Sequence, residues 1–253
     1  MEGKAALVTG GAAGIGLGLV RRLVRGGCAG VTVVDLDGDA AREAARGLPA
    51  ARVLVVEADV TDPAALTRAF DAHRARFGRL DACFANAGGD PPSAGAGGDD
   101  AELWRKIADV NFVAAVHTVR LAVAWMRGQT PAGGAVVITC SASAPFAEHA
   151  KDIEPYASAK AGAVHYARSL GHLRSEGVVV AAVCPQFAPT AFVRRHYGDD
   201  LRAIERLQGR LLAVDEVVGL LRCTQPDAAG RVLVITARRG AQFWAFAGER
   251  ARL

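Results

Sequence analysis

The sequence predicts one α/β domain, residues 1–253, built on a doubly wound parallel sheet of seven strands with helices on both faces. Short runs rich in Val, Ile and Leu recur along the chain, and each is followed by a longer segment with helical spacing of its apolar residues. Such alternation implies right-handed crossovers, which place helices on both faces of a parallel sheet. With 253 residues, 51% of them hydrophobic, the chain can bury the core of one domain.

The expected strands are short apolar runs that begin close to the N-terminus. They are 5–9, 31–35, 52–58, 80–85, 135–140, 178–183 and 231–236. The expected helices lie between these runs, where Ala, Leu and Arg recur with the helical period. They are 14–26, 39–47, 63–77, 100–127, 156–176 and 214–223. Each helix therefore follows a strand and returns the chain to the start of the next one.

Two segments have neither pattern, and both follow the end of an expected strand. Residues 88–100 are rich in Gly, Pro and Ser, and residues 186–213 mix aromatic residues with arginines irregularly. In open α/β sheets the ligand lies at the carboxyl ends of the strands. We therefore expect an active-site loop at 88–100 and a substrate lid at 186–213.

Charge and composition exclude several classes of protein. The 30 basic residues are intermixed with 26 acidic ones, which does not fit the clustered basic face of a nucleic-acid-binding protein. The five cysteines lack the paired spacing of a metal site. The first residues lack the layout of a signal peptide, and no run of about 20 apolar residues suits a membrane helix. We expect a cytoplasmic protein with reduced cysteines that binds no metal, nucleic acid or membrane.

The segment TGGAAGIG, from Thr9 to Gly16, joins the first expected strand to the first expected helix. Gly10, Gly14 and Gly16 allow a tight turn and a close approach to a pyrophosphate, which would accept hydrogen bonds from N–H groups at the helix start, near Ile15. An ordinary strand-to-helix turn can have the same composition. Alone, the segment is a weak indication of a dinucleotide site.

Asp35 ends the second expected strand, 19 residues after Gly16. A carboxylate there can accept hydrogen bonds from both ribose hydroxyls of an adenosine and would repel a 2′-phosphate, so Asp35 favours NAD over NADP. Arg21, Arg22 and Arg25 are further along the helix and do not resemble a 2′-phosphate site. The alternative is that Asp35 is a solvated residue that opens the DLDGD turn.

Tyr156 and Lys160 are four residues apart in EPYASAK, just after Pro155, a residue tolerated in the first turn of a helix. The two side chains should therefore share one helix face. A nearby cation favours the phenolate of a tyrosine, which makes the phenol a usable general acid or base. The alternative is a tyrosine that packs on the lysine stem.

These segments, with Asn86-Ala87-Gly88, Asn111 in DVNF, serines 141 and 143 and CPQFAPT (184–190), resemble the short-chain dehydrogenase/reductase family over about residues 3–191. The resemblance implies a Rossmann-like fold. It also implies that Tyr156 exchanges a proton with the substrate oxygen, that Lys160 lowers the tyrosine pKa and binds the nicotinamide ribose, and that Asn111 completes a water relay.

The resemblance also implies where the cofactor lies. Asp59 and Val60 would contact the adenine, Thr190 the carboxamide, and Pro185 would belong to the segment that covers the nicotinamide. Asn86, Ala87 and Gly88 would line the cofactor side, and Asn86 would also stabilise the sheet. In the family the catalytic serine hydrogen-bonds the substrate oxygen. Alignment of the strand VVITC favours Ser141, whereas the family's usual spacing to Tyr156 gives Ser143, which stays open as the alternative.

Two features depart from the family pattern. Gln186 follows Pro185 where the family usually has glycine, so its side chain could reshape the pocket or restrict the backbone. The C-terminal segment also lacks the Asp-Gly-Gly ending that helps to form tetramers. We expect a homo-oligomer, a dimer or tetramer, and favour a dimer through helices 100–127 and 156–176.

The resemblance predicts an NAD-dependent oxidoreductase that interconverts a secondary alcohol and its ketone. Aromatic and histidine side chains near the expected substrate walls and in the C-terminal segment suggest a partly apolar molecule of moderate size: Phe146, His149, Phe187, Phe192, His196, Tyr197, Phe243 and Trp244. The alternative is that most of them pack the lid against the core. The alternatives are an NADPH-linked ketoreductase, a non-redox lyase or epimerase, and a catalytically silent regulator that senses the dinucleotide. Asp35 favours the oxidative direction, because cellular NAD is mostly oxidised.

Overall fold

A computed structural model describes residues 1–89, 101–146, 153–190 and 223–244, with the short stretches 193–194, 201–202, 205, 210–217 and 221. Most of the predicted loop 88–100 and much of the predicted lid 186–213 lie outside the described residues. The same holds for His149, Phe192, His196 and Tyr197.

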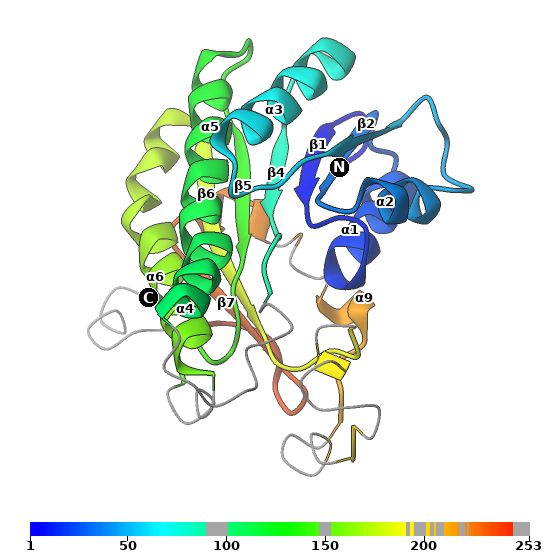
Figure 1. The fold of residues 1–253 in the computed structure, drawn as a ribbon. Helices are drawn as coiled ribbons and strands as arrows, with labels where there is room; N and C mark the ends of the chain where they lie inside the picture. The colour runs from blue at the N-terminus through cyan, green and yellow to red at the C-terminus, as the bar shows by residue number, and fades with distance from the viewer. Residues whose placement is uncertain are drawn as a thin grey trace.

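The described strands form one sheet in the order β3-β2-β1-β4-β5-β6-β7-β8 (Figure 1). Their bounds are β1 Ala5–Thr9, β2 Gly30–Asp35, β3 Val53–Glu57, β4 Ala82–Ala85, β5 Gly134–Thr139, β6 Val178–Pro185, β7 Val232–Thr236 and β8 Gly240–Trp244. The first seven pair in parallel and correspond to the seven predicted strands. The doubly wound α/β fold is therefore confirmed.

The eighth strand, β8, corrects the predicted strand count. It pairs antiparallel with β7 at the edge of the sheet, after a turn at Ala237, Arg238 and Arg239. Its five residues are exposed or half-buried, whereas every residue of β1 and β6 is buried. An edge strand needs no continuous apolar run, so β8 lacked the pattern that identifies buried parallel strands.

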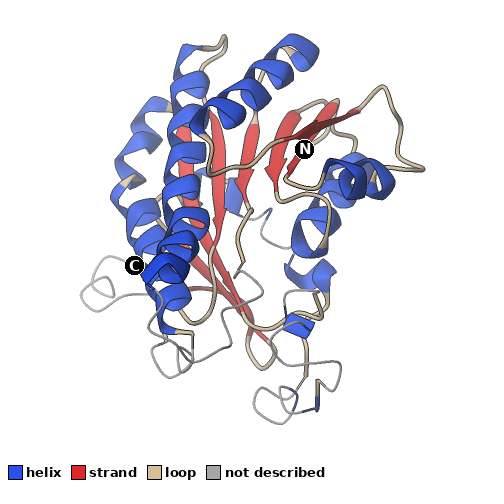
Figure 2. Cartoon of the chain, in the orientation of Figure 1, coloured by secondary structure: helices blue, strands red, loops and turns tan. Residues whose placement is uncertain are grey.

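Helices cover both faces of the sheet (Figure 2). Their bounds are α1 Gly14–Arg25, α2 Gly38–Ala44, α3 Pro63–Phe77, α4 Ala101–Ala108, η1 Asp109–Val113, α5 Ala114–Gly128, α6 Glu154–Ser169, η3 Gly171–Glu176, α9 Val214–Val217 and η5 Pro226–Ala228. One apolar core lies between the sheet and α3, α5 and α6, and a second lies between the sheet and α1, α2 and α9. The predicted helix 156–176 is shorter than expected, because α6 ends at Ser169 and the 3₁₀ helix η3 follows it. α9 is the start of the predicted helix 214–223, and most of the remainder lies outside the described residues.

The predicted helix 100–127 is helical from Ala101 to Gly128 without a gap. It consists of α4, the π-helical turn η1 and α5. By length and composition alone, this stretch could cross a membrane, and it is the one such helix among the described residues. However, α5 packs against β4, β5 and α6, and 44% of the most apolar window is buried. A core helix has these same properties.

Candidate active site

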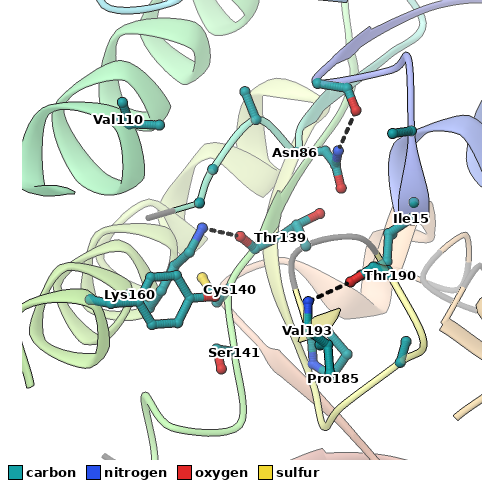
Figure 3. Close-up of a pocket in the computed structure, with 18 of the residues that line it drawn as sticks. Ile15, Asn86, Val110, Thr139, Cys140, Ser141, Lys160, Pro185, Thr190 and Val193 are labelled. Carbon is teal, nitrogen blue, oxygen red and sulfur yellow. Dashed lines mark hydrogen bonds between the residues drawn. The ribbon is translucent and has the colours of Figure 1, made fainter. Parts of the chain in front are cut away.

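A cavity of ≈ 540 Å³ lies at the carboxyl ends of β1, β2, β4, β5 and β6 (Figure 3). All of the predicted site residues except Gly16 and Asn111 line it. The fold therefore gathers residues that are far apart in the sequence into one site. Within the described residues, no group of His, Cys, Asp and Glu side chains could hold a metal ion.

The glycine turn lies between β1 and α1 and requires glycine at its closest contacts. Gly10 has φ +65°, and a Cβ there would be 2.8 Å from the Cα of Ala87. A Cβ at Gly16 would collide with the carbonyl oxygen of Gly10. The N-cap of α1 is Ala13, which supplies no side-chain acceptor for the first N–H groups of the helix. A helix start of this kind at a cavity suits a phosphate group.

Asp35 is held by the glycine turn at the end of β2. One oxygen, Oδ2, accepts a hydrogen bond from the Ala12 N–H at 2.8 Å, and Oδ1 accepts one from the Asp37 N–H at 3.2 Å. The second bond is the one expected of a turn residue, whereas the first fixes the carboxylate at the cavity wall. Asp59 and Val60 line the same end of the cavity, and Lys160, at the other end, is the one basic residue among the described lining residues.

Asn86 joins the glycine turn to the end of β4. Its Nδ2 donates to the carbonyl oxygens of Thr9 and Gly10, both at 3.1 Å. In return, the Thr9 hydroxyl accepts hydrogen bonds from the N–H groups of Asn86 and Ala87, each at 3.0 Å. Asn86 thus stabilises the sheet edge as well as lining the cavity.

Tyr156 and Lys160 lie one turn apart on α6, and both are buried. Lys160 Nζ is 5.7 Å from the centroid of the Tyr156 ring and donates a hydrogen bond at 3.0 Å to the carbonyl oxygen of Thr139, at the end of β5. Figure 3 shows this bond, which holds Lys160 at the cavity wall, and Tyr156 lines the same cavity. Burial of an ammonium requires such partners, because desolvation of a charge is costly.

Asn111 is fully buried in the π-helical turn η1, behind the cavity wall. Its Nδ2 donates to the carbonyl oxygens of Gly89 and Ile107, and its Oδ1 accepts from the Gly89 N–H at 3.0 Å. A Cβ at Gly88 would lie 2.7 Å from Lys160 Nζ and 2.8 Å from Asn111 Oδ1. Asn111 and Lys160 therefore both lie against Gly88, where a side chain would not fit.

Both candidate serines line the cavity, but they are held differently. The chain continues β5 through Ser141, because the N–H groups of Cys140 and Ala142 donate to the carbonyl oxygens of Val183 and Pro185. Ser143 lies in the turn that follows, and its N–H and hydroxyl both donate to Ser141 Oγ, at 3.2 and 3.0 Å. The geometry favours Ser141 as the serine fixed at the strand end, with Ser143 as its support.

Thr190 brings the segment after β6 back to the glycine turn. A Cβ at Gly14 would lie 3.2 Å from Thr190 Cγ2, so the two residues are in near contact. Thr190 Oγ1 accepts a hydrogen bond from the Val193 N–H at 3.4 Å. The segment from Pro185 to Thr190, which we call the cover segment, therefore extends from the end of β6 to the start of α1.

Sequence reasoning missed an apolar part of the cavity wall. It is formed by Leu36, Val110, Ile153 and Val193, and no motif distinguishes them from other apolar residues. Conversely, Phe146, Phe243 and Trp244 are not lining residues. Phe146 packs edge-on against Trp244 of β8, with ring centroids 4.7 Å apart, and Phe243 lies under Arg231. These three rings stabilise the sheet edge and the loop after β5.

Known proteins resemble this chain over most of its length. The short chain dehydrogenase family model matches residues 4–200. A cis-4-hydroxycyclohexanecarboxylate dehydrogenase of Sinomonas cyclohexanicum is 31% identical, over 91% of this chain and 92% of its own. The human 15-hydroxyprostaglandin dehydrogenase [NAD(+)] is 28% identical, over 96% of this chain and 94% of its own.

A solved structure also shares the fold. The crystal structure of 3-ketoacyl-(acyl-carrier-protein) reductase from Brucella melitensis complexed with NADH has a TM-score of 0.82 and 25% identity, and it covers 94% of this chain and 98% of its own. The family match includes the glycine turn, Asp35, Asn111, Ser141, Tyr156 and Lys160. The chain belongs to the short-chain dehydrogenase/reductase family of oxidoreductases.

Proposed function

We propose that this protein is an NAD(H)-dependent oxidoreductase that interconverts a secondary alcohol and its ketone. The main support is that one cavity holds Tyr156, Lys160 and Ser141 at one end and Asp35 at the other. The first three residues can handle a proton and a developing charge on a substrate oxygen. Asp35 can select the cofactor.

The residues at the Asp35 end fit NAD better than NADP. A carboxylate held at the cavity wall can accept hydrogen bonds from two ribose hydroxyls, and it repels a 2′-phosphate. Among the described lining residues, the one cation is Lys160, which bonds to Thr139 at the opposite end. The uncapped start of α1 and the glycine turn would hold the pyrophosphate. The name of the human relative and the NADH bound to the Brucella reductase agree with this proposal.

The chain's own residues supply acid–base chemistry. Ser141 donates its hydroxyl proton to the substrate oxygen, and the two hydrogen bonds that Ser141 Oγ accepts from Ser143 leave that proton available. Tyr156 takes the proton of the alcohol during oxidation and returns it during reduction. Lys160 favours the phenolate by its positive charge. A bound nicotinamide supplies the hydride acceptor or donor.

Lys160 also gives a route for the proton to leave the phenol. Asn111 lies behind Gly88, next to Lys160 Nζ, and its amide is fixed by Gly89 and Ile107. We propose that Asn111 keeps this part of the wall in place for a proton relay from Tyr156 through Lys160. The role of Asn111 is thus to position other groups.

The proposed substrate is a secondary alcohol of moderate size with an apolar body. The wall around the reactive end includes Ala142, Ile153, Phe187 and Val193, whose side chains offer no hydrogen bonds. The Sinomonas relative is named for a hydroxylated cyclohexane acid and the human relative for a hydroxylated prostaglandin. Since both names describe alcohols, we propose that oxidation is the working direction.

A homodimer through the α4–α5 and α6 helices is the assembly we propose. These helices lie side by side on one face of the sheet (Figure 1). Trp104 and Val113, on this helical stretch, are large apolar residues that are 45% and 53% exposed. Sedimentation equilibrium of the wild type and of Val113→Glu tests this proposal, since the added charge should release monomers.

The function is tested with purified protein and a panel of alcohols: cis-4-hydroxycyclohexanecarboxylate, cyclohexanol and 2-octanol. Thermal unfolding with NAD, NADH, NADP and NADPH comes first, because a ligand that binds only the folded state raises the midpoint. We expect stabilisation by NAD and NADH and formation of NADH with at least one alcohol. Stabilisation by NADPH alone, or product formation without NADH, would instead indicate the ketoreductase or the lyase or epimerase. Dinucleotide binding combined with a cellular effect that Tyr156→Phe leaves unchanged would indicate a regulator.

A further inference from the structure

Gln186 stands where the family usually has glycine, and its side chain makes a specific bond. β6 pairs with β7 up to the partners Pro185 and Ile235, and the N–H of Gln186 still donates to the Ile235 carbonyl oxygen at 2.9 Å. In a parallel ladder, the next bond runs from the N–H of Ala237 to the main-chain carbonyl of Gln186. Instead, the Ala237 N–H donates to Gln186 Oε1 at 3.0 Å.

The side-chain amide thus takes the place of the main-chain carbonyl as the last acceptor of the ladder. This exchange satisfies the Ala237 N–H while the main chain of the cover segment turns away from β7 toward the cavity. Glycine has no atom that could make this bond. Gln186 also fastens the cover segment to the turn between β7 and β8. β8 is the strand that the sequence did not predict.

The cover segment is held at two further points, at Phe187 and Thr190, and one bond lies within it. The carbonyl oxygen of Phe187 accepts from the Leu212 N–H at 3.0 Å, and the carbonyl oxygen of Ala188 accepts from the Thr190 N–H at 2.7 Å. Thr190 then lies against Gly14. Gln186 is therefore the first anchor of a segment that lies between the reactive end of the cavity and the glycine turn.

We propose that Gln186 is a positioning residue that sets where the cover segment leaves the sheet, and thereby how tightly the nicotinamide half of the cofactor is held. This inference rests on the proposed function. Asp35, Asp59 and Val60, which would hold the adenosine half, line the cavity near β2 and β3, away from this anchor at β6 and β7. Loss of the Gln186 bond should therefore weaken binding of NADH and leave binding of AMP unchanged.

The test compares Gln186→Met, which keeps the length of the side chain and removes the acceptor, with Gln186→Glu, which keeps an oxygen acceptor. In the methionine variant, we expect hydrogen exchange of the Ala237 amide to accelerate about tenfold and the NADH dissociation constant to rise about fivefold, the effect of one neutral hydrogen bond. The AMP dissociation constant should not change. The glutamate variant should restore slow exchange and most of the NADH affinity.

Two results would overturn the positioning role alone. In one, wild type and Gln186→Met bind NADH equally. In the other, AMP and NADH binding weaken together with the thermal midpoint, which indicates general destabilisation. If the wild-type protein binds no dinucleotide, the proposed function fails, and the positioning role fails with it.

Discussion

Polar side chains have different roles at the amino ends and at the carboxyl ends of the parallel strands. At the amino ends of the strands, polar side chains pair with one another and with the backbone. At the carboxyl ends, Ser141, Tyr156, Lys160 and Asp35 line a cavity. We call the amino ends of the strands the closed edge, because polar groups there hold the strands together. We call the carboxyl ends the open edge, because polar groups there line the cavity.

Asp81 and His73 illustrate the closed edge. Asp81 accepts hydrogen bonds from the Ala5 N–H and from Arg79, and it forms a longer ion pair with Lys4. Burial alone would raise the pKa of Asp81, but the Arg79 guanidinium, the Ala5 N–H and Lys4 together lower it. Such a group contributes to stability and is not available to a substrate.

His73, on α3, is fully buried and bonded through both ring nitrogens. Nδ1 lies 2.7 Å from the Thr32 hydroxyl, and Nε2 lies 2.9 Å from the carbonyl oxygen of Arg79. Since a carbonyl oxygen only accepts, Nε2 carries the proton and Nδ1 accepts from Thr32. Desolvation by burial lowers the His73 pKa to about 4, although the hydrogen bond to Arg79 opposes the shift. The comparison predicts that changes at the open edge affect catalysis and that changes at the closed edge affect stability.

Replacement of Tyr156 by Phe gives the largest expected effect. It should abolish most of the catalytic activity and leave cofactor binding and stability unchanged. The variant keeps the buried ring and loses the phenol that exchanges the proton. We expect kcat/KM to fall about 10³-fold with the best alcohol of the panel, within the usual range for a general acid or base. The NADH dissociation constant and the thermal midpoint should stay close to wild type. Activity within tenfold of wild type would assign the proton transfer to another group.

The next largest effect is a loss of stability in acid through His73. The unfolded chain takes up a proton on this histidine near pH 6.5, whereas the folded protein does so only near pH 4. The free energy of unfolding is therefore unaffected by His73 protonation above pH 6.5 and decreases as pH falls toward 4. The decrease is about 1.4 kcal/mol per pH unit, or about 3 kcal/mol in total. Urea unfolding at pH 7, 6, 5 and 4.5 measures this slope.

His73→Gln is the control for that experiment, because glutamine does not titrate. The variant should be less stable at pH 7 and should lose most of the slope between pH 6.5 and 4. Asp81 cannot supply that slope, since its lowered pKa places its own loss of stability below that range. A variant that keeps the full wild-type slope would show that other groups destabilise the protein in acid.

The sequence was sufficient to predict the parallel strands, and the predicted site residues other than Gly16 and Asn111 line the cavity. Buried strands show continuous apolar runs, and the glycine turn, Asp35 and the Tyr156–Lys160 pair keep fixed positions relative to strand and helix ends. What the sequence did not show depends on contacts between distant segments. The edge strand β8 has no apolar run, and the bond between Gln186 and Ala237 joins residues 51 positions apart.

The choice between the two candidate serines also required tertiary contacts. Counting residues left Ser141 and Ser143 as alternatives, because the loop between β5 and α6 can take up extra residues. The ladder bonds of Cys140 and Ala142 to β6 place Ser141 at the end of the sheet and Ser143 in the turn. Their roles stay a prediction, which steady-state kinetics of the two alanine variants can test.

Replacement of Asp35 should change cofactor preference without loss of catalysis. We expect Asp35→Ala to weaken NAD binding about thirtyfold, the effect of lost hydrogen bonds to a charged group, and to improve NADP binding. Asp35→Asn is the matched control, since it keeps an acceptor for the Ala12 N–H and removes the charge. Titration calorimetry with both cofactors should show better NADP binding in each variant and the larger loss of NAD binding in the alanine variant. Unchanged preference in both would refute the assignment of Asp35.

The smallest expected effect distinguishes the two serines. Ser143→Ala removes the hydroxyl that donates to Ser141 Oγ but keeps the Ser143 N–H donor, so Ser141 retains one of its two supports. We expect kcat to fall about fivefold, as for loss of one neutral hydrogen bond, with little change in KM. Ser141→Ala removes the group that contacts the substrate oxygen and should cost more, about 100-fold, on the scale of one lost oxyanion donor. The reverse order in steady-state kinetics would make Ser143 the catalytic serine and Ser141 its support, because each hydroxyl lines the same cavity and either could reach the substrate.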